Sequence, residues 1–292
     1  MSDDRFDRSV RFFGIEGQKR IKDTTLAIAG IGGLGSIVVQ EASLLGFGAM
    51  HQVDPGEFKT SGRNRYATAR HDDPVPGTWK VDIGRRLAHS IDPSIKIETV
   101  ADSVISEAGF AAIKETDVVL GCLDAEGARL LLLQVCAVLR KPYIDMATQI
   151  FPEEIPIRYG GRVCSSFFGR GCLSCLDVLD RKEASRDLAG DAERANRTAL
   201  YGVDAEYLAD SGPSVAPLNG VVASLGVMEL MAYVTGLRPP QPHLNYDGRT
   251  GKAGLRVERL TTDCYFCDGL FTGKQNADLT ELLHMPLASS PT

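Results

Sequence analysis

Several features that would place this protein in a familiar class are missing from its sequence. Basic residues are not in excess, because 38 acidic side chains against 32 Lys and Arg leave a net charge of −6. Nucleic acids and anionic membrane surfaces attract basic proteins, so we expect neither as a partner. The amino terminus is polar and acidic, unlike a secretory signal peptide, and we expect a cytoplasmic protein.

Long uninterrupted apolar runs are also missing. The stretch 130–139 is too short to cross a bilayer and lies between Arg129 and Arg140, while 216–235 contains Glu229. A transmembrane helix needs about 20 predominantly apolar residues. We therefore expect no membrane span.

Histidine is scarce, with five residues and no metal-ligand spacing, so we assign the histidines no role. Cysteine is distributed differently, because four of the seven form two Cys-x-x-Cys pairs, Cys172 with Cys175 and Cys264 with Cys267. Two matching pairs predict a structural zinc ion held by four thiolates. A redox pair or simply buried thiols are the alternatives. This usage fits a reducing cytosol better than a disulfide framework, and we expect the other cysteines to be buried and structural: Cys122, Cys136 and Cys164.

What the sequence does have is a glycine-rich turn between an apolar strand and a helix. The strand covers 26–29, the next strand ends in Asp54, and the glycines of the turn are Gly30, Gly32, Gly33 and Gly35. This is the layout of a nucleotide-binding βαβ unit, in which glycines let the backbone approach phosphates and a carboxylate binds ribose hydroxyls. The alternative is that the glycines only allow the helix to pack closely on the strand.

Strands and helices alternate through the first half of the chain, after an amphipathic helix over 5–20. The predicted strands are 26–29, 49–53, 95–100, 117–120 and 143–146, and the helices between them are 36–45, 81–90 and 125–139. This alternation predicts an α/β fold with a Rossmann-like, doubly wound, mostly parallel sheet.

The pattern changes after residue 151. A strand over 155–159, an apolar helix over 218–236 and a hairpin of 244–246 with 255–257 predict an antiparallel C-terminal extension. The zinc ion would clamp this extension. The stretch 177–214 is polar and weakly periodic, which predicts a mobile or partner-binding crossover.

Positive charge gathers in the long connection 55–80, which contains Arg63, Asn64, Arg65 and Lys80. A nicotinamide cofactor does not need such charge at this point of the fold. A triphosphate does, because Arg and Lys can neutralise the charge on transferred and leaving phosphates. For each of these side chains alone, simple solvation is the alternative.

Asp124 follows the carboxyl end of the predicted strand 117–120, where open α/β sheets bind ligands. A lone carboxylate that faces phosphates is a natural Mg²⁺ ligand. An N-cap for the helix 125–139 is the alternative, since Asp is a good capping residue.

Taken together, these residues resemble the MoeB/ThiF/HesA adenylyltransferases and the adenylation domain of ubiquitin-activating enzymes. The resemblance covers roughly residues 5–270. The motifs that carry it are Arg5-Phe6-Asp7-Arg8, the glycine turn, Asp54, Asn64-Arg65, Gly77-Thr78-Trp79-Lys80, Cys122-Leu123-Asp124 with Arg129, both cysteine pairs, and Gly226-Val227-Met228-Glu229.

The resemblance implies that Mg·ATP adenylates the C-terminal carboxylate of a small β-grasp protein, a ubiquitin-like or sulfur-carrier protein ending in Gly-Gly, and that pyrophosphate is released. It implies that Asp54 holds the ribose, that Arg65 and Lys80 hold phosphates with Asn64 and the glycine turn beside them, and that Asp124 binds Mg²⁺. It also implies a homodimer in which Arg8 reaches the partner subunit's ATP.

On this basis we expect a single adenylation domain over 1–270. Its first half, 1–150, would bind the nucleotide, and its second half, 151–270, would bind the carrier protein and zinc. A flexible tail would follow over 271–292.

The sequence departs from the family pattern at Gly62, Tyr66 and Ala125. Residues 176–263 contain no cysteine, although relatives that form a thioester or persulfide carry that thiol in the crossover. We therefore expect the reaction to stop at the acyl-adenylate or to pass it to a downstream acceptor protein. Three other functions stay open at this point: a nucleotide-binding pseudoenzyme or scaffold, adenylation of a short peptide, and a nicotinamide-dependent oxidoreductase.

Overall fold

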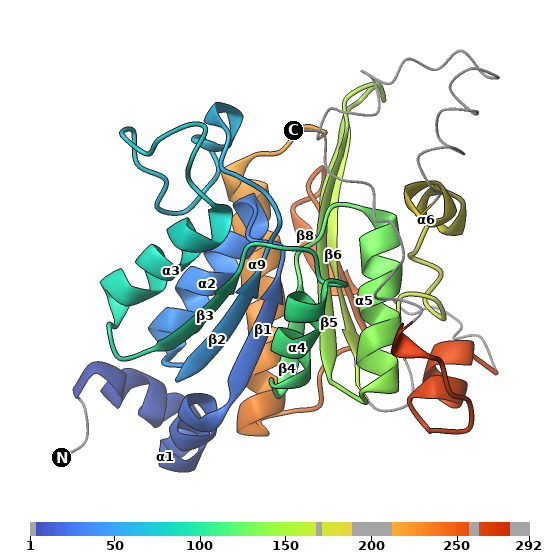
Figure 1. The fold of residues 1–292 in the computed structure, drawn as a ribbon, viewed down its shortest axis with the longest axis horizontal. Coiled ribbons are helices and arrows are strands. Elements are labelled where there is room, and N and C mark those ends of the chain that lie inside the picture. Colours follow the sequence, from blue (N-terminus) through green and yellow to red (C-terminus); the bar gives the residue numbers. More distant parts are fainter. Residues whose placement is uncertain (1–3, 168–170, 189–211, 257–262, 281–292) are drawn as a thin grey trace.

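A single eight-stranded sheet runs through the protein, in the order β3-β2-β1-β4-β5-β6-β7-β8 (Figure 1). The computed structural model describes residues 4–167, 171–188, 212–256 and 263–280. Strands β1 to β5 pair in parallel, and β6, β7 and β8 continue the sheet in antiparallel pairs. The strands are β1 Thr25–Ala29, β2 Ala49–Val53, β3 Lys96–Val100, β4 Val118–Gly121, β5 Tyr143–Phe151, β6 Arg158–Ser166, β7 His243–Asp247 and β8 Lys252–Leu255. The predicted fold class is confirmed.

Helices cover both faces of this sheet, because the central strands bury side chains on both sides. In β1, Leu26 and Ile28 join the core under α2, α3 and α9, while Ala27 and Ala29 join the core under α4 and α5. Alternating side chains of a strand point to opposite faces, so a strand buried twice must be apolar throughout. The helices are α1 Asp7–Asp23, α2 Gly33–Leu45, α3 Lys80–Ile91, α4 Glu107–Lys114, α5 Glu126–Val138, α6 Arg181–Asp187 and α9 Ala216–Thr235, with short turns η1 Asp4–Phe6, η2 Thr60–Gly62 and η3 Tyr265–Leu270.

Two elements differ from the sequence prediction. The predicted strand 155–159 starts three residues too early, because β6 begins only at Arg158 and Ile155 is 97% exposed in the turn before it. Pro156 lies in that segment and has no N–H to give to a ladder, so apolar composition alone was misleading. Helix α4 was not predicted at all, although Ser106 caps it by accepting a hydrogen bond from the Gly109 N–H.

The C-terminal hairpin is confirmed, with β7 and β8 joined by the turn that follows Asp247. The end of its predicted second strand, at Val257, lies outside the described residues. Beyond the hairpin, Phe271 is buried, and Ala277 and Leu279 pack against the same core as the cysteine pairs. The rest of the predicted tail, 281–292, and residues 189–211 of the predicted crossover 177–214 also lie outside the described residues, whereas the described start of that crossover contains helix α6.

Helix α9 is long and apolar enough to satisfy the length and hydropathy of a membrane span, but 61% of that window is buried inside the protein. It packs against α2 and against β5 and β6. Its one acidic residue, Glu229, is buried and is held by two hydrogen bonds from Arg238 and one from the Gln241 N–H. Helix α9 is therefore a core helix that packs on one face of the sheet.

Candidate functional site

The glycine turn lies at the carboxyl end of β1 and leads directly into α2. Gly30 has a φ of 89°, a left-handed conformation that favours glycine. A Cβ on Gly35 would come within 1.9 Å of the Gly30 carbonyl oxygen, so no larger residue fits there. Because α2 begins at Gly33, the N–H groups of its first turn have no acceptor within the helix and face this turn, as anion sites at helix starts do.

Asp54 fastens the glycine turn to the connection that follows β2. Its Oδ2 accepts a hydrogen bond of 2.7 Å from the Ile31 N–H, and its Oδ1 accepts one of 2.8 Å from the Gly56 N–H. The Lys80 ammonium lies 3.4 Å from the same Oδ1. The buried carboxylate therefore fixes both the backbone of the turn and the position of a cation beside it.

Lys80, the first residue of α3, is the cation at this site. Burial disfavours its charge, but attraction to Asp54, together with Tyr66 and Asp124, outweighs that effect and raises the pKa of Lys80. Tyr66 shares a side-chain hydrogen bond with Lys80, and burial raises the pKa of Tyr66 to about 12. The phenol is therefore neutral near pH 7 and places a hydrogen-bonding group beside the ammonium.

Arg65 lies across the start of α2. A Cβ on Gly33 would come within 3.0 Å of the Arg65 Cγ, so this glycine makes room for the arginine's aliphatic stem. The Arg65 Nη1 donates to the Ser61 carbonyl at 2.6 Å. Asn64 is exposed beside it, and its Oδ1 lies 3.5 Å from the same Nη1.

Two of the predicted cations do not join this group. Arg63 donates to the carbonyls of Arg70, His71 and Asp73 and so braces its own connection. Arg8 is exposed on α1, which lies at the bottom of the view in Figure 1, whereas the connection 55–79 lies at the top. Within this chain, Arg8 and the glycine turn therefore lie at opposite ends of the parallel strands.

Asp124 is exposed in the loop between β4 and α5. The predicted alternative role as a helix cap is wrong, because the capping position of α5 is occupied by Ala125. The loop is held from below by Arg129, whose Nε and Nη2 donate to the Leu123 carbonyl at 2.9 and 2.6 Å. Arg129 is itself buried beside Asp145, at 3.8 Å from its Oδ1. The sequence signal for this support was Arg129 in the resemblance motif.

Cys122 begins the same loop, two residues before Asp124, and is only partly buried, whereas the expectation was a buried cysteine. Burial, with some repulsion from Asp145, raises the pKa of the Cys122 thiol well above its ordinary range. A thiol is a nucleophile only as its thiolate. The predicted structural role of Cys122 therefore agrees with its surroundings.

The two cysteine pairs meet in one buried cluster between α5 and η3. The Sγ atoms of Cys172 and Cys264 are 3.5 Å apart, those of Cys175 and Cys267 are 3.9 Å apart, and all four lie within 4.8 Å of one another. Sulfur ligands about 2.3 Å from a tetrahedral zinc ion lie about 3.8 Å from each other. The donor set and its spacing therefore fit zinc, as predicted.

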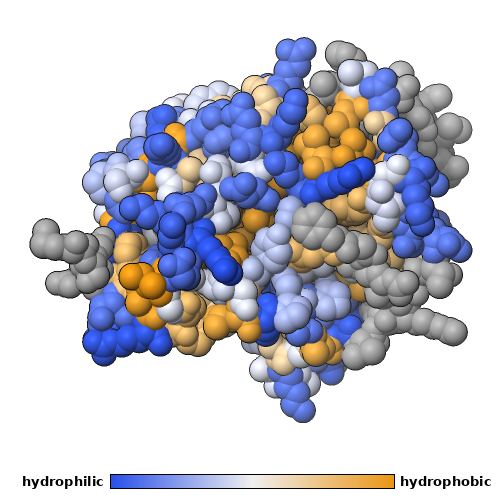
Figure 2. All heavy atoms as spheres, turned by 90° about the horizontal axis from the view of Figure 1, so that it is seen from below, coloured by the Kyte–Doolittle hydropathy of each residue, from blue (hydrophilic) through white to orange (hydrophobic). Residues whose placement is uncertain are grey.

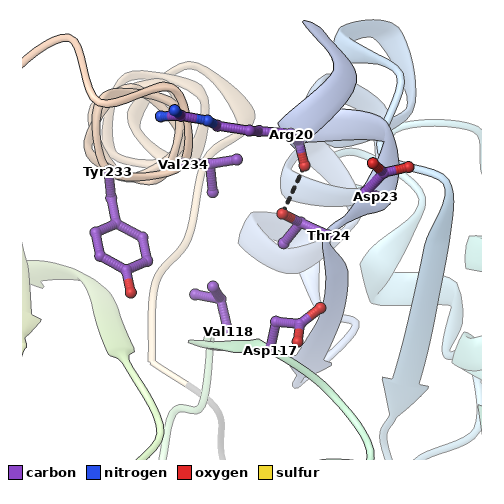
Figure 3. Close-up of a pocket in the computed structure, with 7 residues that line it drawn as sticks. All are labelled: Arg20, Asp23, Thr24, Asp117, Val118, Tyr233 and Val234. Carbon is purple, nitrogen blue, oxygen red and sulfur yellow. Dashed lines mark hydrogen bonds between the residues drawn. The ribbon is translucent and has the colours of Figure 1, made fainter. Parts of the chain in front are cut away.

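One hollow of the described surface lies away from this site. It has a volume of about 510 Å³ and is lined by residues from the end of α1, the start of β4 and the end of α9 (Figure 3). Arg20 and Thr24 lie at its rim, joined by a 2.7 Å hydrogen bond from the Thr24 Oγ1 to the Arg20 carbonyl. Because β4 begins there and runs parallel to β1, this hollow lies at the end of the strands opposite the glycine turn.

The fold and the site define a Rossmann-like α/β protein with an anion-binding type of glycine turn and a four-cysteine cluster. The ThiF family model matches residues 6–268. The chain belongs to the ThiF family, as the resemblance indicated. The hypothesis of a nicotinamide-dependent oxidoreductase, which the glycine turn alone had left open, is therefore dropped.

Several proteins of similar sequence are named as adenylyltransferases. The sulfur carrier protein ThiS adenylyltransferase of Escherichia coli is 24% identical over 273 residues, which are 91% of this chain and 95% of that protein. The molybdopterin-synthase adenylyltransferase of the same organism is 28% identical over 241 residues, 81% of this chain and 84% of that protein. The adenylyltransferase and sulfurtransferase MOCS3 of Drosophila willistoni is 23% identical over 260 residues, and the chain spans about half of its length.

Solved structures share the fold. The crystal structure of Escherichia coli MccB with AMPCPP and selenomethionine-containing MccA has a TM-score of 0.71 at 17% identity, over 92% of this chain and 75% of that one. Selenomethionine-containing PaaA has a TM-score of 0.61 at 17% identity, over 88% of this chain. At this identity the likeness extends to the arrangement of the elements only.

Proposed function

We propose that the protein is an ATP-dependent adenylyltransferase that activates the C-terminal carboxylate of a small ubiquitin-like or sulfur-carrier protein and releases pyrophosphate. The observation that carries the proposal is the meeting of Lys80, Asp54 and Tyr66 beside the glycine turn, with Asp124 near enough to act on the charge of Lys80. The family and the printed names of its members support it.

The site's residues can bind a nucleoside triphosphate in a definite order. The first turn of α2 would receive phosphates, with Arg65 and Lys80 on either side and Asn64 at the rim. Asp54 would hold the ribose: each of its oxygens accepts one backbone N–H, and an ionised carboxylate has about four acceptor positions. Asp124 is the carboxylate available for Mg²⁺, which supplies charge neutralisation on the phosphates when bound.

The proposed reaction needs no general base. The attacking group is a carboxylate, which is already ionised near pH 7. Its oxygen forms a bond to the α-phosphorus, and the bond from that phosphorus to the leaving pyrophosphate breaks with its electron pair. Lys80 and Arg65 then act by alignment and by stabilising the charge on the leaving group. This agrees with a candidate site that has no histidine among its described residues.

We also propose a cytoplasmic homodimer. Apolar side chains gather in patches on the face that carries α1 (Figure 2). On α1 and the neighbouring α2, Phe12, Ile15 and Leu44 are 61%, 68% and 56% exposed. Covering such side chains is the usual driving force for association. In a dimer, Arg8 of one subunit could complete the site of the other, which it cannot do within its own chain.

Isotope exchange between pyrophosphate and ATP tests the activity. The protein would be mixed with Mg·ATP and small carrier proteins that end in Gly-Gly, and a carrier with an amidated C-terminus would be the matched control. We expect exchange only with the free carboxylate. A short peptide with a free carboxyl group distinguishes the alternative substrate class. Binding of Mg·ATP with no exchange for any of these carboxylates would instead identify a pseudoenzyme.

A further inference from the structure

A second group of metal-ligating side chains lies away from both the glycine turn and the cysteine cluster. His51 on β2, Glu98 on β3 and Glu115 at the end of α4 each present one ligand atom, and these atoms lie within 4.8 Å of one another. All three line one hollow of about 510 Å³, together with Lys96 and Thr25. Three elements thus converge on one point of the surface.

The sheet itself brings two of these ligands together. His51 and Glu98 are register partners in the parallel pairing of β2 and β3, so their side chains project from the same face. The His51 Nε2 lies 3.6 Å from a Glu98 carboxylate oxygen. This neighbourhood is set by backbone pairing and does not depend on a flexible loop.

The imidazole of His51 is oriented as metal-binding imidazoles are. Its Nδ1 lies 2.9 Å from the Ala112 carbonyl oxygen. A carbonyl oxygen only accepts, so Nδ1 carries a proton, and Nε2, which faces Glu98, is the nitrogen whose lone pair a metal ion would use. A backbone carbonyl that fixes the far nitrogen in this way is the usual support of a histidine ligand.

The charges at this point are unfavourable without a cation. Two carboxylates lie close together, and Glu115 stands at the C-terminal end of α4, where the helix dipole is negative. Lys96 lines the same hollow, but among the described residues it forms no salt bridge with either glutamate. A divalent cation would relieve both repulsions and use the lone pair of His51.

We propose that His51, Glu98 and Glu115 bind a divalent transition-metal ion. One imidazole and two carboxylates suit Mn²⁺, Fe²⁺ or Zn²⁺, and the hollow leaves the remaining coordination positions to water. The ion would join β2, β3 and α4, with His51 three residues, or roughly 10 Å of strand, before Asp54. It is independent of the proposed adenylation, so the two can be tested separately.

Mn²⁺ is the probe of choice, because it favours carboxylate and imidazole ligands over the thiolates of the cysteine cluster. Binding to the nucleotide-free protein would be measured from the loss of the free Mn²⁺ electron paramagnetic resonance signal. We expect one Mn²⁺ per chain, and at least roughly tenfold weaker binding in both His51→Gln and Glu115→Gln. Glu115 is exposed, so its variant should fold even if the histidine variant does not.

Two controls complete the test. His71→Gln removes an exposed histidine elsewhere and should bind Mn²⁺ as the wild type does. Asp124→Asn should also bind it normally, and Mn²⁺ should raise the melting temperature of the wild type more than that of Glu115→Gln. The proposal is overturned if the wild type binds no Mn²⁺, or if Glu115→Gln binds Mn²⁺ as tightly as the wild type. Loss of binding in Asp124→Asn instead would assign the ion to the nucleotide edge.

Discussion

At the scale of single residues, Lys80 and Asp124 provide the positive and the negative charge on which the proposed reaction most depends. We expect Lys80→Ala and Asp124→Ala each to lower pyrophosphate exchange by at least roughly 10²-fold, the usual effect of removing one preorganised electrostatic contact. The fold should survive, because Asp124 is exposed and Lys80 is at the start of its helix. Lys252→Ala, on an exposed edge strand, is the matched control. Near wild-type exchange in either site variant would refute the assignment.

Tyr66 offers a finer test at the same scale, because Tyr66→Phe removes only the hydroxyl that bonds Lys80. The ring should still pack edge-on against Phe58, 5.2 Å away. We expect KM for ATP to rise about tenfold with little change in kcat, as for loss of one hydrogen bond to a charged group. Tyr159→Phe, on the exposed part of β6, serves as control.

Tyr66 also has a spectroscopic signature that does not depend on activity. Its pKa is raised to about 12, so the phenol stays protonated when ordinary tyrosines near pH 10 have already ionised. An ultraviolet titration of the folded protein should lose one late-ionising tyrosine in Tyr66→Phe. An unchanged titration would mean that the hydroxyl is not buried against Lys80.

At the scale of elements, the cysteine cluster joins the segment after β6 to η3. We expect one zinc ion per chain by elemental analysis, and none in Cys172→Ser. Loss of the clamp should lower the melting temperature, by roughly 2–4 °C for each kcal/mol in a domain of this size. Affinity for ATP should change much less, because the cluster lies under α5 and not at the glycine turn. Ser174→Ala, inside the first pair, should keep its zinc, whereas zinc-free wild-type protein would disprove the site.

The elements that the sequence predicted well are those whose side chains have one simple task. Strands β1 and β4 are mostly apolar because both of their faces are buried, and no residue larger than glycine fits at position 35 of the glycine turn. The start of the predicted strand 155–159 was wrong because an exposed turn contains Ile155 and Ile157. Helix α4 was missed because it is short. The group around His51 was invisible to spacing rules, since only the register of β2 with β3 brings its members together.

At the scale of the whole molecule, the separation of Arg8 from the glycine turn makes a dimer necessary if Arg8 takes part. Arg8→Ala and Lys80→Ala protomers should each be inactive alone, yet random mixing should restore about a quarter of the wild-type exchange, because each mixed dimer contains one intact site. Analytical ultracentrifugation would establish the dimer directly. A monomer with full activity would exclude this role for Arg8.

A zinc ion at the cysteine cluster would have a consequence for how the chain is connected. With zinc bound, the 88 residues between Cys175 and Cys264 would form a ring closed by the metal, and this ring would contain α9, β7 and β8. A single break of the peptide chain between residues 189 and 211 would therefore open the ring without separating the two pieces. Proteolytic cutting there should give two bands on a denaturing gel but one particle in solution, because β7 pairs with β6 and α9 packs against α2 and β5 in addition to any metal link. Chain continuity and structural integrity are then separate properties in this protein.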